Sequence, residues 1–185
     1  MRKVFLFIIM FFLALPVLAE DYRKIYRDTP VPDFAYIHGV DPKHFFENRY
    51  ASYSVYPLLR LSSPLFYKTI TVTPGYYDLS PREHEGQDYV LFKQNGLVVH
   101  ILPVFKKEPV PPGFYKKHLK REKRAITQKI GDGFHKLIGK IRKHSFRTMA
   151  AKTYLEVNDV DDNFVVLVVY YDDFRYYVLM RSVKM

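Results

Sequence analysis

The sequence predicts an α+β protein in which an antiparallel sheet packs against a basic amphipathic helix. Three observations predict this fold. Asn95-Gly96, the dipeptide favoured in type I′ hairpin turns, separates two strand-like runs. Residues 152–183 hold three further apolar runs divided by polar turns, which indicates a three-stranded meander. Between these parts, residues 114–147 carry apolar side chains at helical spacing, so strands and helix are segregated along the chain.

The first nineteen residues are typical of a secretory signal peptide. Arg2 and Lys3 precede an uncharged apolar run, and Val17-Leu18-Ala19 suits signal peptidase. As a helix, the apolar run would reach only about 22 Å, too short for a bilayer core of roughly 30 Å. We therefore expect residues 1–19 to be cleaved and the protein to be exported to the periplasm or the exterior of a bacterium.

The absence of cysteine narrows the chemistry. With no cysteine in 185 residues, a disulfide framework, a thiolate metal site and a cysteine nucleophile are all excluded. No Asn-x-Ser/Thr sequon occurs either, which also favours a bacterial envelope over a eukaryotic secretory route.

Residues 20–52 are expected to form an irregular N-terminal segment with one short helix, about 42–50, where Asp41 is the N-cap and Pro42 the first helical residue. An α+β domain, residues 53–185, follows. Its first part, 53–105, is β-rich, and Glu83-His84-Glu85 is expected in a loop. The two-residue turn at Asn95-Gly96 sets the expected register of the hairpin: Gln94 opposite Leu97, Lys93 opposite Val98, Phe92 opposite Val99, Leu91 opposite His100, and Val90 opposite Ile101.

Residues 106–113 contain three prolines and are expected to be a stiff connector. The basic helical part, 114–147, follows with a bend near Gly131. The β-meander, 152–183, has expected strands 152–157, 164–171 and 174–183. With Asp172-Asp173 as the last turn, one apolar face is expected to receive the helix, and it pairs Val169 with Tyr176, Leu167 with Val178, and Val165 with Met180. The opposite face pairs Tyr170 with Arg175 and Phe164 with Arg181.

The positive charge of the protein is local. Residues 114–147 hold twelve lysine and arginine residues against two acidic ones, whereas the rest of the chain after residue 19 holds fifteen basic and seventeen acidic residues. Such a concentration of charge attracts polyanions. Two alternatives involve no ligand. The segment can be an ordinary core helix with a solvated outer face, or its positive charge can be compensated within the protein by the acidic turns at 158–163 and 172–173.

These observations predict a non-enzymatic, exported bacterial envelope protein that binds an anionic surface or polymer through a cationic amphipathic helix. Its expected partners are anionic lipid headgroups or other envelope polyanions, and no nucleic acid, because export removes that target and no recognised nucleic-acid motif is present. Whether the protein has a protein partner is unknown from the sequence. The expected polyanion-binding residues are Lys116, Lys117, Lys120, Arg121, Lys123, Arg124, Lys136, Lys140, Arg142 and Lys143.

No metal site, cofactor or catalytic residue is predicted. Asp159, Asp161 and Asn163 alternate as in a calcium loop, but Phe164 and Tyr170 stand where that loop needs glycine and glutamate. His38, Asp41 and His44 are close in sequence, but Pro42 denies them one continuous helix.

Two other function classes remain open. The first is a small periplasmic hydrolase that uses His84 or His100 with nearby carboxylates, although no nucleophile motif is present. The second is a structural or protein-interaction module that binds through tyrosine-rich strands. Because neighbouring residues of a strand point to opposite faces, half of each tyrosine pair is expected in the core; the pairs are Tyr76-Tyr77, Tyr170-Tyr171 and Tyr176-Tyr177.

Overall fold

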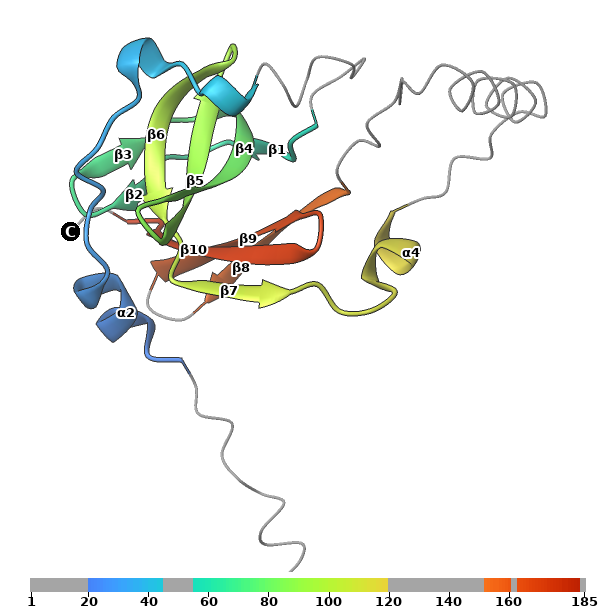
Figure 1. The fold of residues 1–185 in the computed structure, drawn as a ribbon. Helices are drawn as coiled ribbons and strands as arrows, with labels where there is room; N and C mark the ends of the chain where they lie inside the picture. Colours follow the sequence, from blue (N-terminus) through green and yellow to red (C-terminus); the bar gives the residue numbers. More distant parts are fainter. Residues whose placement is uncertain (1–19, 45–54, 120–151, 161–162, 184–185) are drawn as a thin grey trace, which may run out of the picture.

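Two antiparallel sheets packed face to face make up the body of the protein, with short helices on the outside (Figure 1). The structure is a computed structural model, and it describes residues 20–44, 55–119, 152–160 and 163–183. The expected signal peptide, residues 1–19, lies outside these ranges. The described part is mostly antiparallel β-structure, so the expected sheets are confirmed but the helical share of an α+β fold is small.

The first sheet is built from neighbouring parts of the chain. Asn95 and Gly96 have φ of 51° and 80°, so the predicted tight turn is confirmed, as is the pairing of Lys93 with Val98. A β-bulge then shifts the register by one residue, and Phe92 lies opposite His100 rather than Val99. Its strands have the order β1-β4-β5-β6, where β1 is Leu58–Leu61, β4 Gly75–His84, β5 Gln87–Gln94 and β6 Leu97–Pro103.

The expected loop at Glu83-His84-Glu85 is wrong for its first two residues. Glu83 and His84 end β4 in regular pairing with β5. The chain turns at Glu85 and Gly86, whose φ of 50° and 78° are those of another tight hairpin turn.

The second sheet contains the predicted meander. Every predicted pair between β9 and β10 is confirmed, from Tyr170 opposite Arg175 to Phe164 opposite Arg181. The strand order is β3-β2-β10-β9-β8, and β7 pairs with the same edge of β10 as β2 does. The bounds are β2 Leu65–Tyr67, β3 Ile70–Val72, β7 Lys106–Pro109, β8 Thr153–Val160, β9 Phe164–Tyr171 and β10 Phe174–Arg181.

The predicted stiff connector at 106–113 is partly a strand. Residues 106–109 pair with Tyr177 to Phe174 of β10. Pro109 is tolerated because it stands at the end of an edge strand, where its missing N–H breaks no long ladder.

The inner core lies between the two sheets. Val165, Leu167 and Val169 of β9 are buried there against Tyr77 and Leu79 of β4 and their neighbours. The meander face that was expected to receive the basic helix is therefore covered by the first sheet. A sheet buries more of this apolar face than one helix would, because the sheet covers the whole width of three apolar strands.

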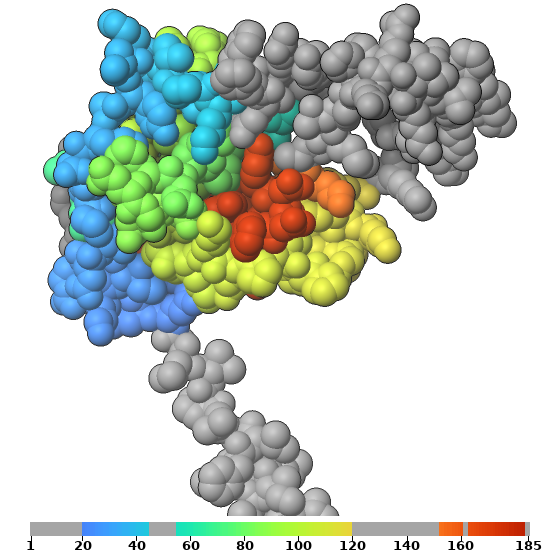
Figure 2. Space-filling view, in the orientation of Figure 1, coloured from blue at the N-terminus to red at the C-terminus, as the bar shows by residue number. Residues whose placement is uncertain are grey.

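The outer core lies on the opposite face of the second sheet. Helix α2, Tyr22–Asp28, and the short helix α4, Phe114–His118, lie on this face, at the left and right of Figure 1. Figure 2 shows the segment from β7 to α4, in yellow, below the red β9–β10 hairpin. Strand β9 is thus buried on both faces, from Phe164 to Tyr170.

The N-terminal segment is more ordered than predicted. Helix α2 begins after Asp21, whose carboxylate accepts a hydrogen bond from the Lys24 N–H at 3.1 Å. A 3₁₀ turn, η1 (Ile37–Gly39), precedes the predicted helix start at Pro42, of which residues 42–44 are described and helical.

Candidate functional site

An aromatic cluster fixes the start of the basic segment to the outer face of the second sheet. The Phe114 ring stacks on Tyr170 with centroids 4.2 Å apart, and the His118 ring stacks on Phe114 at 4.3 Å. Tyr154 of β8 packs edge-on against Phe114 and lies 5.3 Å from His118. These four rings, called the aromatic cluster below, join α4 to β8 and β9.

The basic helix expected over 114–147 begins at Phe114 as predicted but ends after five residues. Helix α4 ends at His118, and Leu119 has an extended backbone with φ −85° and ψ 116°. Gly113, with φ 80°, turns the chain into α4 but supplies no side-chain cap. The ring of His118, the last helical residue, stacks on Phe114 of the cluster, and the helix does not continue at Leu119.

Two of the ten expected polyanion-binding residues fall on this helix. Lys116 and Lys117 are exposed, and within the described ranges no ion pair joins either of them to a carboxylate. The other eight lie outside the described residues: Lys120, Arg121, Lys123, Arg124, Lys136, Lys140, Arg142 and Lys143.

Both flanks of residues 120–151 are fixed at the same place. On one flank, His118 contacts Tyr154, two residues after Lys152. On the other, the ammonium of Lys152 lies 5.9 Å from the centre of the Tyr115 ring, within range of a cation–π contact. Lys152 is exposed and adds a cation beside α4 that the sequence reasoning missed.

One acidic turn lies beside α4. The Tyr115 hydroxyl donates a hydrogen bond to the backbone carbonyl of Asp172 at 2.8 Å. Burial, together with the nearby carboxylates of Asp172 and Asp173, raises the pKa of Tyr115 to about 12. The contact that holds α4 is made by the Tyr115 phenol to a backbone carbonyl. In the described structure, no ion pair joins the carboxylates of Asp172 and Asp173 to Lys116 or Lys117.

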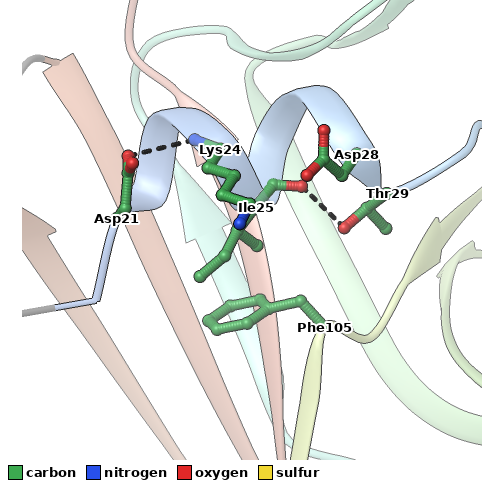
Figure 3. Close-up of a pocket in the computed structure, with 6 residues that line it drawn as sticks. All are labelled: Asp21, Lys24, Ile25, Asp28, Thr29 and Phe105. Atoms are coloured by element: carbon green, nitrogen blue, oxygen red, sulfur yellow. Dashed lines mark hydrogen bonds between the residues drawn. The ribbon is translucent and has the colours of Figure 1, made fainter.

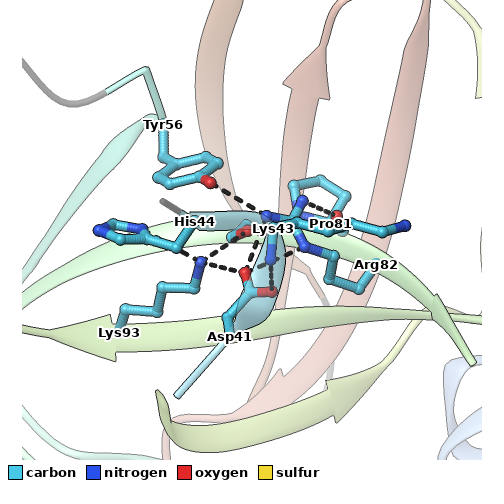
Figure 4. Close-up of polar contacts among 8 residues, drawn as sticks. Asp41, Lys43, His44, Tyr56, Pro81, Arg82 and Lys93 are labelled. Atoms are coloured by element: carbon cyan, nitrogen blue, oxygen red, sulfur yellow. Dashed lines mark hydrogen bonds and ion pairs between the residues drawn. The ribbon is translucent and has the colours of Figure 1, made fainter. Parts of the chain in front are cut away.

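A buried charge cluster lies at a different place, on the outer face of the first sheet (Figure 4). One carboxylate oxygen of Asp41 accepts hydrogen bonds from the Arg82 guanidinium at 2.8 and 3.1 Å and from the Lys93 ammonium at 2.5 Å. The three side chains are at most 5% exposed. The Lys93 ammonium also donates to the Ser80 hydroxyl at 3.1 Å and lies 4.5 Å from the centre of the Tyr56 ring.

The electrostatics of this cluster favour the ion pairs. Burial by itself would raise the pKa of Asp41, but the hydrogen bonds from Arg82 and Lys93 outweigh it, and the net pKa is lowered. Burial and the charge of Lys93 lower the pKa of His44. Lys93 is engaged in an ion pair with Asp41, and Ser80 is completely buried, so the Ser80–Lys93 contact supports packing rather than nucleophilic chemistry.

The sequence carried one signal for this cluster. Lys93 directly follows the apolar run Tyr89 to Phe92 in the predicted hairpin, and Ser80 and Arg82 lie on the same face of β4. Asp41 was interpreted only as an N-cap, and that is confirmed, because its second oxygen accepts the Lys43 N–H at 3.1 Å.

The two histidines considered for hydrolysis are packed against aromatic rings. His84 stacks on Phe34 with centroids 4.0 Å apart, and His100 lies 6.3 Å from the Tyr77 ring. Burial lowers the pKa of His100. Within the described ranges, no hydrogen bond joins either histidine to a carboxylate.

The tyrosine pairs divide between faces as expected. Tyr77 is buried whereas Tyr76 is exposed, and Tyr176 and Tyr177 belong to the inner and outer cores respectively. Tyr170 and Tyr171 likewise contact opposite cores. Only Tyr76 among these six offers a largely exposed ring.

The described surface has a shallow hollow of about 460 Å³ beside α2 (Figure 3). Lys24 and Thr29 are already engaged there in hydrogen bonds that cap the two ends of the helix. The hollow brings together no acid–base pair, and its lining is Asp21, Lys24, Ile25, Asp28, Thr29 and Phe105.

Among the described residues, no group of three or more histidine, aspartate or glutamate side chains is placed to hold a metal ion. The same residues include no helix with the length and apolar character that a bilayer crossing requires. No known protein family, curated protein or solved structure matches the chain.

Proposed function

We propose that this protein is an exported, non-enzymatic protein of the bacterial envelope, periplasmic or extracellular, that binds an anionic surface or polymer through its basic segment. The observation that carries the proposal is the placement of that segment. Its first turn is fixed by the aromatic cluster with Lys116 and Lys117 exposed, and Lys152 stands beside the same point. The anionic partner is an acidic lipid headgroup or an envelope polyanion, recognised by charge.

The inner core supports this assignment. The apolar face of the meander, which could have buried the stripe of the basic segment, is packed against the first sheet. The remaining charge of the chain after residue 19 is slightly negative, so the body supplies no competing positive field.

Sedimentation with lipid vesicles tests the proposal. The chain from residue 20 is expected to bind phosphatidylglycerol vesicles at low salt, to bind them far less at high salt, and to leave phosphatidylcholine vesicles unbound. Each basic residue near an anionic surface contributes about 1 kcal/mol. Replacing Lys120, Arg121, Lys123 and Arg124 by glutamine should therefore weaken binding by on the order of a hundredfold to a thousandfold.

A matched variant controls for net charge. It replaces four exposed cations elsewhere on the molecule with glutamine and should bind nearly as the unaltered chain does; the four are Lys24, Arg27, Lys43 and Arg60. Equal losses in both variants would mean that net charge alone attracts the protein. Binding to neutral vesicles, or binding insensitive to salt, would contradict an electrostatic mechanism.

A further inference from the structure

Strand β8 differs from the other edges of the two sheets. It pairs with β9 in one unbroken register over eight residues, without a bulge, a proline or a lysine. Within the described ranges, no strand pairs with its other side. Long, regular, open edges are templates for a further strand, and proteins usually protect them.

The other edges carry such protection. Strands β1 and β3 have only four and three residues, and β7 contains two lysines and a terminal proline. Strand β6 is interrupted by its bulge, and Val40 bridges to Leu97 at its start. Strand β8 has none of these protective features, which indicates that its open edge pairs with another strand.

The hydrogen-bond pattern shows what the open edge presents. The Asp172 N–H donates to the Lys152 carbonyl at 2.8 Å, so Thr153 and Tyr171 form a non-hydrogen-bonded pair. The backbone N–H and C=O groups of the even-numbered residues of β8 therefore form the hydrogen bonds to β9. The odd-numbered residues direct their N–H and C=O groups away from the sheet: Thr153, Leu155, Val157 and Asp159.

We propose that β8 pairs antiparallel with β8 of a second copy of this chain, with the two-fold axis at Val157. In this register the backbone N–H and C=O groups of Val157 form hydrogen bonds with those of Val157 in the second copy. Leu155 lies opposite Asp159 of the second copy. On the outer face, Glu156 lies opposite Asn158, whose amide can donate to the carboxylate. Val157, the central residue, is a 50% exposed apolar side chain in the single molecule.

Charge decides between the two symmetric registers nearest the strand centre. An axis at Glu156 would place two carboxylates directly opposite each other, which destabilises a strand pair. The Tyr170 hydroxyl holds the Glu156 carboxylate at 3.0 Å, so it cannot easily turn away. The axis at Val157 removes this repulsion and makes the edge self-complementary.

The dimer is weak by its size. With the axis at Val157, the two strands overlap over residues 154–160, and seven residues a side give a contact at the low end of protein interfaces. We therefore expect a dissociation constant on the order of micromolar or weaker. The inference does not depend on the charge of the basic segment, and vesicle binding and dimerisation can fail separately.

Sedimentation velocity of the chain from residue 20, from about 5 µM to about 500 µM, should show a shift from monomer to dimer. Val157→Lys places a charge on the axis and should leave a monomer over the whole range. Val99→Lys, the same change at a 41% exposed valine of β6, should dimerise as the unaltered chain does. A monomeric unaltered chain, or a Val157→Lys variant that still dimerises, would overturn the proposal.

A cross-linking variant tests the dimer through the gain of a covalent product rather than through the loss of dimerisation. The chain has no cysteine, so Val157→Cys introduces a single thiol. Across the axis, the Cα atoms of a hydrogen-bonded pair lie about 5.5 Å apart, a separation that a disulfide can bridge. Mild oxidation should yield a covalent dimer from Val157→Cys and much less from Val99→Cys. Equal cross-linking of the two variants would overturn the register.

Discussion

Asp41 performs two tasks with its two carboxylate oxygens. One oxygen caps the helix that begins at Pro42, and the other receives Arg82 and Lys93. Through this one side chain, the N-terminal segment is fastened to two strands of the first sheet. We interpret the cluster as a structural link, because its cations are buried and its Ser80 and Tyr56 hydroxyl groups belong to buried residues.

Asp41→Asn separates the two tasks, because asparagine remains a good N-cap but carries no charge. Removing one partner of a buried ion pair usually costs about 3–5 kcal/mol of unfolding free energy, since the remaining charges stay buried. We expect a loss of that size in urea unfolding. Asp28→Asn, which removes an exposed partner of Arg27, should cost less than about 1 kcal/mol.

Acid unfolding of the same two chains checks the assignment. A carboxylate whose pKa is lowered by folding contributes stability above its unfolded pKa of about 3.9, and this stability is lost as the pH falls through the folded value. The unaltered chain should therefore lose stability in this acidic range. The Asp41→Asn variant should lack that part of the pH dependence, and an unchanged profile would contradict the assignment.

At the scale of elements, the sequence predicted pairings across tight turns better than pairings between distant parts of the chain. The β9–β10 register followed from a two-residue turn, because such a turn leaves little freedom. The β5–β6 register was correct for two pairs and then failed at a bulge that no residue type announces. Strand β7 was missed because its partner, β10, lies far along the chain.

The candidate site shows the same limit. Asp41 and Lys93 are 52 positions apart, so no local pattern could join them. The composition located the positive charge. However, the end of α4 at His118 depends on stacking against Phe114 and on contact with Tyr154 of a strand that follows the basic segment, which sequence periodicity does not contain.

Two glycines in turns predict different costs for the same substitution. Gly86 and Gly39 both have positive φ, so alanine is strained by about 1 kcal/mol at each. At Gly86 a new Cβ meets nothing within 4 Å, whereas at Gly39 it would lie 3.1 Å from the Val98 carbonyl oxygen. Thermal unfolding should therefore show a clearly larger loss for Gly39→Ala than for Gly86→Ala, and equal losses would contradict the close approach of η1 to β6.

At the scale of the whole molecule, the topology allows the two-sheet body to be separated from residues 120–151 of the basic segment. The flanks of residues 120–151 meet at the aromatic cluster, and every strand pair in the described structure is formed by residues outside this range. Replacing 120–151 with a Gly-Ser linker of about eight residues, which spans roughly 15 Å, should keep the fold. We expect a cooperative thermal transition within a few degrees of the unaltered chain, with vesicle binding lost.

The same variant distinguishes the alternative roles of the segment. If residues 120–151 are needed for stability, the shortened chain will unfold early or without cooperativity. Retained vesicle binding by a folded, shortened chain would instead place the anion-binding surface on the body.

The position of β10 has a consequence for how the chain reaches its native state. The first sheet is formed by consecutive hairpins, but the second needs β10, the last described strand, to join β9 with both β2 and β7. Contacts between such distant parts form slowly, because the intervening chain must first be ordered. Until β10 is synthesised, β2, β7 and β9 lack their shared partner, so the apolar face of the first sheet is incompletely covered and is exposed to aggregation. A chain with this topology benefits from being kept unfolded until β10 is synthesised, and the export that we propose would provide this condition if it carries the chain in an extended state.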